Sequence, residues 1–169
     1  MSLGSLPALV TPHIWLAEHR DAETVARLMV GFRNDLGLDW PSDNAFLAGV
    51  ERLLDDRDSE FLIGSPHDDA PPGGVVQLRY RWGIWRAGFD CLLEDLYVVD
   101  DARRSGLGRA LVDGAIARAR ERGCRRMELD TNEDNATARA LYEGLGFVND
   151  RYGARDLYYR LHLDAGKDA

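Results

Sequence analysis

One stretch of this chain restricts its fold more than any other. The apolar run Leu92–Val99 is followed by the glycine-rich segment Arg103–Gly108, and helical spacing of apolar residues begins near Leu107. This order predicts a buried strand that turns sharply into a helix. Backbone N–H groups of a glycine turn can approach phosphate oxygens, and the positive end of the helix dipole adds to the attraction. The predicted pyrophosphate-binding loop consists of Arg103, Arg104, Ser105, Gly106, Leu107 and Gly108, with further positive charge from Arg109.

The rest of the chain predicts one mixed domain of helices and strands. Helical spacing begins after Asp21, recurs over 45–54, and runs from Leu107 to a stop at Gly123. Strands are predicted at 13–20, 60–64, 75–82, 89–99, 126–131, 147–148 and 157–163. The strand–helix–strand crossover over 92–131 favours an α/β or α+β sheet flanked by helices. For 169 residues we expect a single domain, 1–169, with its core at about 13–163.

A second segment gives the loop a more specific meaning. It contains Asn135, Ala138, Leu141, Tyr142, Gly146 and Phe147. Together with the run Leu93–Val98 and the glycine loop, this pattern resembles the GNAT superfamily of acyl-CoA-dependent N-acyltransferases. The resemblance covers about residues 13–163. The run Leu93–Val98 also resembles, less strongly, the polyamine and histone-tail branch of that superfamily.

The resemblance implies a fold and a co-substrate. The fold would be a mixed, mostly antiparallel twisted sheet with about four helices, whose central strand pair splays apart to bind acyl-CoA. The implied co-substrate is acetyl-CoA. Backbone groups of Leu96, Tyr97 and Val98 would pair with the pantetheine amides and polarise the thioester carbonyl. Asn135 would add a hydrogen bond to the co-substrate, although a helix N-cap accounts for this residue equally well.

Tyr142 is the predicted catalytic acid. By resemblance it lies near the sulfur of acetyl-CoA, where its hydroxyl protonates the departing thiolate. The alternative is a structural role, because an aromatic residue on the buried stripe of a helix commonly belongs to the core.

Glu94 is the predicted general base. Strict alternation along the strand would place Glu94 on the same face as Leu92 and Leu96, where a carboxylate is unusual. Partial burial would raise its pKa, which suits a base that acts through water or a recognition group for an ammonium ion. A register shift of one residue would bring Asp95 to this face instead, and a mechanism without a dedicated side-chain base also stays open.

Aromatic residues suggest how an acceptor amine is held. Trp82 and Trp85, together with Tyr80 and Trp40, could form walls for an alkylammonium group, with Glu94 as counter-charge. Equally, the two hairpin tryptophans could pack the hairpin or form a homodimer contact.

The sequence therefore predicts an enzyme that moves an acetyl group from acetyl-CoA to a small cationic, polyamine-like primary amine. Neither Cys91 nor Cys124 lies in the motifs, so direct attack by the amine is preferred to an acyl-enzyme. Two alternatives remain. One is an acetyltransferase of protein lysines or N-termini, and the other is a non-catalytic acyl-CoA-binding sensor.

Composition excludes several other classes. A net charge of −8 argues against nucleic-acid and anionic-membrane partners. No apolar run approaches the length of a membrane span, and we expect a cytoplasmic protein. The four histidines lack zinc-ligand spacing, so no metal is expected. No Gly-x-Ser-x-Gly turn is present, which disfavours a serine hydrolase.

Overall fold

The computed structural model describes residues 11–161 and residue 163. The chain divides into two compact units, Met1–Leu129 and Asp130–Ala169, and each is described by itself. Within the described ranges, every helix is too short or too polar to cross a bilayer.

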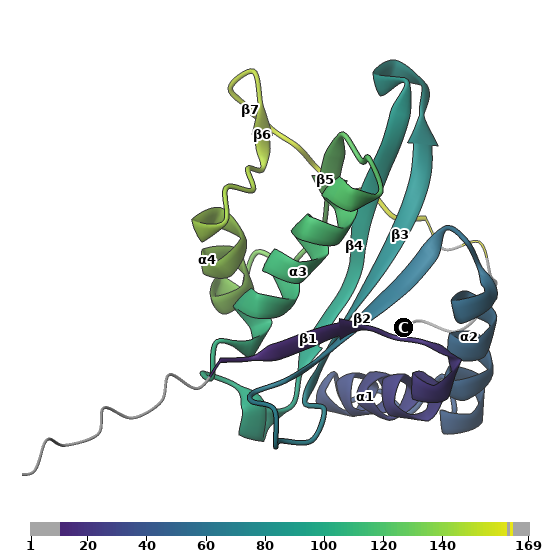
Figure 1. Ribbon diagram of the computed structural model, residues 1–169. Coiled ribbons are helices and arrows are strands. Elements are labelled where there is room, and N and C mark those ends of the chain that lie inside the picture. The colour runs from purple at the N-terminus through teal and green to yellow at the C-terminus, as the bar shows by residue number, and fades with distance from the viewer. Residues whose placement is uncertain (1–10, 162, 164–169) are drawn as a thin grey trace, which may run out of the picture. The chain divides into compact units, whose positions relative to one another are not determined.

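The first unit is built on a five-stranded sheet, formed by β1 (His13–Leu16), β2 (Ser59–Ser65), β3 (Gly74–Gly83), β4 (Gly88–Val98) and β5 (Arg126–Glu128). The strands lie in chain order (Figure 1). Neighbours from β1 to β4 are antiparallel, whereas β5 pairs parallel to β4. A parallel neighbour requires a crossover connection, and a helix provides it here. The sequence prediction of a mixed, mostly antiparallel sheet is confirmed.

Helices cover both faces of this sheet: α1 (Ala22–Asp35), α2 (Asp43–Asp55) and α3 (Leu107–Glu121), with 3-10 turns η1 (His19–Asp21), η2 (Ile84–Arg86) and η3 (Asp100–Ala102). On one face, a Cβ added to Gly74 would lie 2.7 Å from Leu111 of α3. On the other face, Tyr97 of β4 stacks on Phe32 of α1 with ring centroids 5.4 Å apart. Adjacent strand residues point to opposite faces, so α1 and α3 enclose the sheet between them.

The core of this unit lies mainly between the sheet and α1. Val25 and Leu28 of α1 meet Phe61 and Ile63 of β2 and Val75 of β3, and all five are at most 1% exposed. Burying side chains of this size contributes roughly 1.5–3 kcal/mol each. This packing fixes α1 against β2 and β3, and β3 is the neighbour of the strand that leads to the predicted phosphate loop.

The second unit contains α4 (Ala136–Gly144) and a short hairpin of β6 (Asp150–Arg151) and β7 (Ala154–Arg155). Tyr152 and Gly153 have φ values of +54° and +82°, which suits a two-residue turn with a left-handed backbone at both positions. The strands predicted at 147–148 and 157–163 are wrong for the described residues, because strand pairing occurs at 150–155 instead; position 162 lies outside the described residues. An alternating pattern in one segment does not specify which other segment it will pair with, or whether it will pair at all.

Candidate active site

The predicted phosphate loop forms the start of α3. Gly106 is the N-cap residue and has φ +84°, a left-handed backbone that favours glycine. A Cβ placed on Gly106 would meet no atom within 4 Å, so the space in front of the loop is open. The Ser105 hydroxyl donates to the Ala102 carbonyl (2.6 Å) and accepts from the Leu107 N–H (3.3 Å). The loop is thus held by hydrogen bonds between its own residues. As at any helix start, the first-turn N–H groups have no carbonyl acceptor within the helix.

The strand before the loop has an open edge. Pairing between β4 and β5 is confined to Asp90–Leu92 against Arg126–Glu128, whereas β4 continues to Val98. From Leu93 to Val98, β4 therefore keeps its neighbour β3 but has no partner in β5. This is the splayed strand pair that the resemblance implied, and it leaves backbone groups available to an extended amide-containing ligand.

The direction of these backbone groups follows from one hydrogen bond. The Val99 N–H donates to the Gly73 carbonyl at 2.9 Å, on the β3 side of the strand. Because backbone groups alternate along a strand, those of Tyr97 also point to β3, and those of Leu96 and Val98 point to the open edge. Of the three predicted contact residues, Leu96 presents both its N–H and its carbonyl at the open edge. Val98 presents only its N–H there, because its carbonyl accepts a hydrogen bond from Arg103. The Tyr97 ring stacks on Phe32 of α1.

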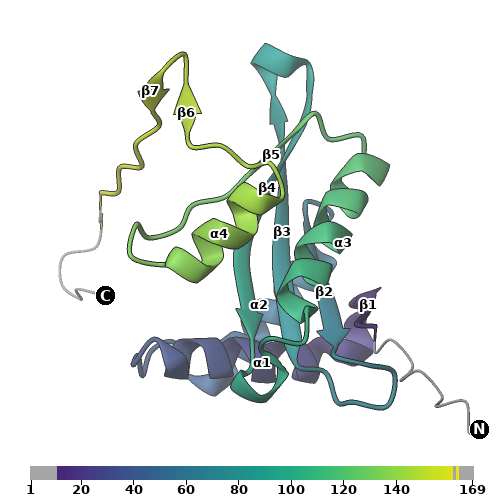
Figure 2. The ribbon, with the colours of Figure 1, turned by 90° about the vertical axis from the view of Figure 1, so that its left-hand side faces the viewer.

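The three arginines of the loop differ in their surroundings. Arg103 forms an ion pair with Asp35 at the end of α1, with 3.0 Å between the charged atoms. Arg104 is exposed and has φ +59°. Arg109, also exposed, approaches Asp113 only to 3.7 Å. Figure 2 shows the connection from β4 to α3 passing beside α1, where the Arg103 contact occurs.

Glu94 occupies a β-bulge. The register pairs Leu78 with Leu93 and Gln77 with Asp95, so Glu94 has no partner on β3. The prediction of strict alternation through Glu94 is therefore wrong, because an extra residue in one strand shifts the faces beyond it. The expected partial burial is wrong as well, since Glu94 is exposed. After the bulge, Asp95 occupies a regular strand position and is half-buried.

The predicted aromatic walls lie far from Glu94 along the strand. Trp82 pairs with Phe89, five residues before Glu94, which corresponds to roughly 17 Å of extended chain. Trp82 and Trp85 are exposed at the β3–β4 hairpin tip, which Figure 1 shows extending beyond its neighbours in the sheet. Tyr80 is not a wall, because it is buried and donates a hydrogen bond to Glu60.

In the second unit, Asn135 caps α4 and Tyr142 is buried. The Asn135 side-chain oxygen accepts from the Ala138 N–H at 3.2 Å, which confirms the N-cap interpretation. Tyr142 is 8% exposed, and its ring meets Phe147 edge-on. Burial, assisted by the negative charge of Asp130, raises the pKa of the Tyr142 phenol. The group therefore keeps its proton throughout the neutral range.

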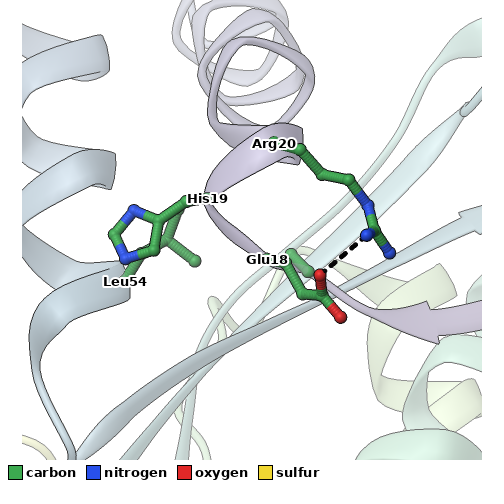
Figure 3. Close-up of a pocket in the computed structure, with 5 residues that line it drawn as sticks. Glu18, His19, Arg20 and Leu54 are labelled. Atoms are coloured by element: carbon green, nitrogen blue, oxygen red, sulfur yellow. Dashed lines mark ion pairs between the residues drawn. The ribbon is translucent and has the colours of Figure 1, made fainter.

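A surface hollow elsewhere in the first unit does not belong to this site. Ala17, Glu18, His19, Arg20 and Leu54 line it at the beginning of α1 (Figure 3). The phosphate loop contacts the opposite end of that 14-residue helix, roughly 20 Å away at 1.5 Å per residue. In the hollow, Arg20 pairs with Glu18 at 2.9 Å, and His19 turns toward Leu54.

The loop, the open strand edge and the order of elements can now be compared with known proteins. A profile of the acetyltransferase (GNAT) family matches residues 25–147. The chain belongs to this family. It is accordingly an acyl-CoA-dependent N-acetyltransferase, as its sequence predicted.

Individual relatives agree with the family. An aminoglycoside N(6′)-acetyltransferase type 1 of Acinetobacter genomosp. 13 is 31% identical over 127 residues, which cover 73% of this chain and 85% of the relative. The crystal structure of a protein assigned as an acetyltransferase from Arthrobacter sp. FB24 is 28% identical, with a TM-score of 0.79 over 94% of this chain and 99% of that chain. An aminoglycoside N-acetyltransferase crystallised with CoA has a TM-score of 0.72 over 93% of this chain and 99% of that chain; at 23% identity this likeness concerns the fold alone.

Proposed function

We propose that this GNAT protein transfers an acetyl group from acetyl-CoA to a primary amine of a small polycationic acceptor. The observation that carries the proposal is the open edge of β4, followed through η3 by a glycine loop at the N-terminus of α3, a geometry suited to an anion. A pantetheine arm with a pyrophosphate at one end has the matching order of groups.

The chain's own residues suit each part of this co-substrate. The backbone groups of Leu96 and the N–H of Val98 are suited to pair with the pantetheine amides, whereas the Val98 carbonyl already accepts from Arg103. The space beside Gly106 is open, and the first-turn amides of Gly108 and Arg109 are suited to the pyrophosphate, with the Arg104 and Arg109 side chains supplying charge. Acetyl-CoA brings an already activated thioester, so the protein needs only to hold its carbonyl, accept a proton from the amine and return one to the thiolate.

Tyr142 is proposed as the proton donor. A donor must remain protonated at the working pH, and the raised pKa of its buried hydroxyl meets that condition. Residues 1–169 would form one acetyltransferase domain.

The acceptor is proposed to be a small molecule with several positive charges. Glu94 and Asp95 stand together at the bulge where β4 begins its free edge, and the whole chain carries a net charge of −8. The relative named as an aminoglycoside acetyltransferase is consistent with an acceptor of this kind. Aminoglycosides and polyamines both carry several ammonium groups.

The first test is thiol release from acetyl-CoA with a panel of polyamines, aminoglycosides, amino acids and basic peptides, with CoA binding measured in parallel. We expect turnover with polycationic small molecules. Turnover with peptides alone would replace this acceptor class by protein amines. Tight CoA binding without turnover across the panel would favour the sensor.

Tyr142→Phe tests the proposed acid. We expect kcat to fall about 100-fold, the typical contribution of a positioned acid, while the Kd for CoA stays unchanged. Tyr159→Phe is the control, because Tyr159 lies in the same unit and is 84% exposed. An unchanged kcat in Tyr142→Phe would remove Tyr142 from the mechanism.

A further inference from the structure

Arg103, the first residue of the phosphate-loop motif, is bound by groups of the protein itself. Its Nε donates to the Val98 carbonyl at 3.0 Å, and one terminal nitrogen lies 3.0 Å from a carboxylate oxygen of Asp35. The other terminal nitrogen pairs with Asp100 at 2.5 Å. All three nitrogens of the guanidinium are thus engaged, and two carboxylates already surround its single charge.

Asp35 stands where an acid is normally unfavourable. It is the last residue of α1, and the C-terminal end of a helix dipole repels negative charge. Two groups offset this repulsion: the Arg103 guanidinium and the Tyr97 hydroxyl, which hydrogen-bonds to the Asp35 carboxylate. Burial and this hydrogen bond raise the pKa of Tyr97, so the hydroxyl remains a donor.

The approach of α1 to this cluster depends on a glycine. A Cβ on Gly31 would lie 3.1 Å from the Tyr97 hydroxyl oxygen, closer than side chains normally allow. Glycine inside a helix costs about 1 kcal/mol relative to alanine. Here it permits the end of α1 to lie against β4, so that Asp35 reaches both Tyr97 and Arg103.

We propose that Arg103 is a positioning residue and not a ligand of the phosphates. Its planar fork joins the end of β4, the turn at Asp100 and the end of α1, and thereby sets the position of the phosphate loop relative to the free edge of β4. The inference rests on the proposed binding of CoA at this loop. Charge on the pyrophosphate is then matched by Arg104, Arg109 and the loop amides.

The two roles make opposite predictions for conservative changes. A phosphate ligand acts through its positive charge, which lysine retains. A fork that binds three separate acceptors cannot be replaced by one ammonium group. Removing the charge of Asp35 would strengthen CoA binding if Arg103 served the phosphates, because it would free the guanidinium. If Arg103 positions the loop, the same change weakens binding.

The experiment measures the Kd for CoA by calorimetry, and KM and kcat with acetyl-CoA, in Arg103→Lys, Arg103→Gln, Asp35→Asn and the Arg103→Gln/Asp35→Asn double variant. We expect each single change to weaken CoA binding by about three- to tenfold, as for loss of one or two exposed charge-assisted contacts, and the double variant to be no weaker than either. The KM for acetyl-CoA rises and kcat at saturation is retained. Thermal unfolding changes little, because Arg103 and Asp35 are 52% and 41% exposed.

Arg104→Lys and Arg104→Gln form the matched pair on the neighbouring arginine. We expect Arg104→Lys to bind CoA nearly as the parent protein does, and Arg104→Gln to bind more weakly, with a deficit that shrinks at high salt. The deficit of Arg103→Lys is expected to persist at high salt. Wild-type affinity in Arg103→Lys, or tighter binding in Asp35→Asn, overturns the positioning role alone. Absence of CoA binding in the parent protein overturns this inference together with the proposed function.

Discussion

Arginines lie at both ends of α3, but their surroundings differ. At the N-terminal end, Arg104 and Arg109 lie exposed around a loop that faces open space. At the C-terminal end, Arg118 and Arg122 both bind Glu60 of β2, with contacts of 2.7 and 2.8 Å. The arginine charges at the N-terminal end are therefore available to a ligand, whereas those at the C-terminal end are paired with a carboxylate of the protein.

The C-terminal cluster is satisfied from several directions. The Glu60 carboxylate also accepts from the Tyr80 hydroxyl at 2.9 Å, and the Arg122 guanidinium lies 4.0 Å from the centroid of the Tyr80 ring. Burial alone would raise the pKa of Glu60, but hydrogen bonds from Arg118, Tyr80 and Arg122 outweigh it and lower that pKa. The difference between the two ends shows that arginine content along α3 does not reveal which arginines are available for binding.

The largest expected effect comes from placing the same charge at each end of the helix. Gly106 and Gly123 have φ values of +84° and +72°, and an added Cβ meets no atom within 4 Å at either position. Gly106→Glu should weaken CoA binding by on the order of 100-fold or more, because a carboxylate would face the pyrophosphate. Gly123→Glu should bind CoA normally, as measured by calorimetry.

Stability provides the control for this pair. Both substitutions place a side chain on left-handed backbone, which costs about 1–2 kcal/mol. The helix dipole adds a smaller difference, about 0.3–1 kcal/mol, that favours Glu at position 106. The fold is therefore expected to tolerate Gly106→Glu better than Gly123→Glu, so a loss of CoA binding in Gly106→Glu alone would not be due to unfolding. Retained CoA affinity in Gly106→Glu would contradict the phosphate-loop assignment.

The next largest effect concerns stability at the other end. Glu60→Gln should lower the free energy of unfolding by about 2 kcal/mol, because two arginines lose a partly buried carboxylate. Asp113→Asn, which alters the exposed and longer Arg109–Asp113 pair, should cost less than about 0.5 kcal/mol. Urea unfolding measures both, and similar losses would show that the two ends are energetically alike.

The pH dependence sharpens the same prediction. A lowered pKa in the folded state means that the Glu60 carboxylate stabilises the protein fully above its unfolded pKa of about 4.3. This stabilisation is lost as the pH falls through the folded-state value. The difference in unfolding free energy between the parent protein and Glu60→Gln should therefore be greatest near neutral pH and should narrow in acid.

The smallest effect distinguishes exposed arginines on the same helix. Arg109→Gln should weaken CoA binding by about two- to fivefold, the range of one exposed charge contact, and the loss should diminish with salt. Arg120→Gln removes another exposed arginine, near the far end of the helix, and should leave CoA binding unchanged. Equal losses in the two variants would indicate a general effect of net charge.

Local pattern was sufficient for the phosphate loop and its flanking elements. An apolar run, paired glycines and helical periodicity each act within a few residues, so β4, the turn at Gly106 and α3 could be predicted. The Asn135 cap is similarly local. Asp35 also gives a local signal, because an acid at the C-terminal end of a helix is unfavourable. This signal does not identify Arg103 as its partner.

The errors arose where distant segments decide the outcome. The bulge at Glu94 depends on how β3 pairs with β4, and no alternation within β4 alone reveals it. The assignment of Tyr80 to an acceptor wall was wrong for a similar reason. The Tyr80 hydroxyl donates a hydrogen bond to Glu60, which lies 20 residues away in the sequence, so local pattern could not reveal this partner. The strand predicted at 157–163 has a suitable pattern, yet strand pairing in this unit occurs at 150–155.

Residue identity and short spacing were sufficient to predict the family, the glycine turn before α3 and the types of groups proposed for acetyl transfer. The folded structure was needed to show that β5 pairs with β4 only as far as Leu92, and that Arg103 is bound to Asp35, which lies 68 residues away in the sequence. Strand register and ion pairing are set by which surfaces the folded chain brings together. The residue type limits which groups a side chain can bind, and the packing of the folded chain determines which of them it contacts.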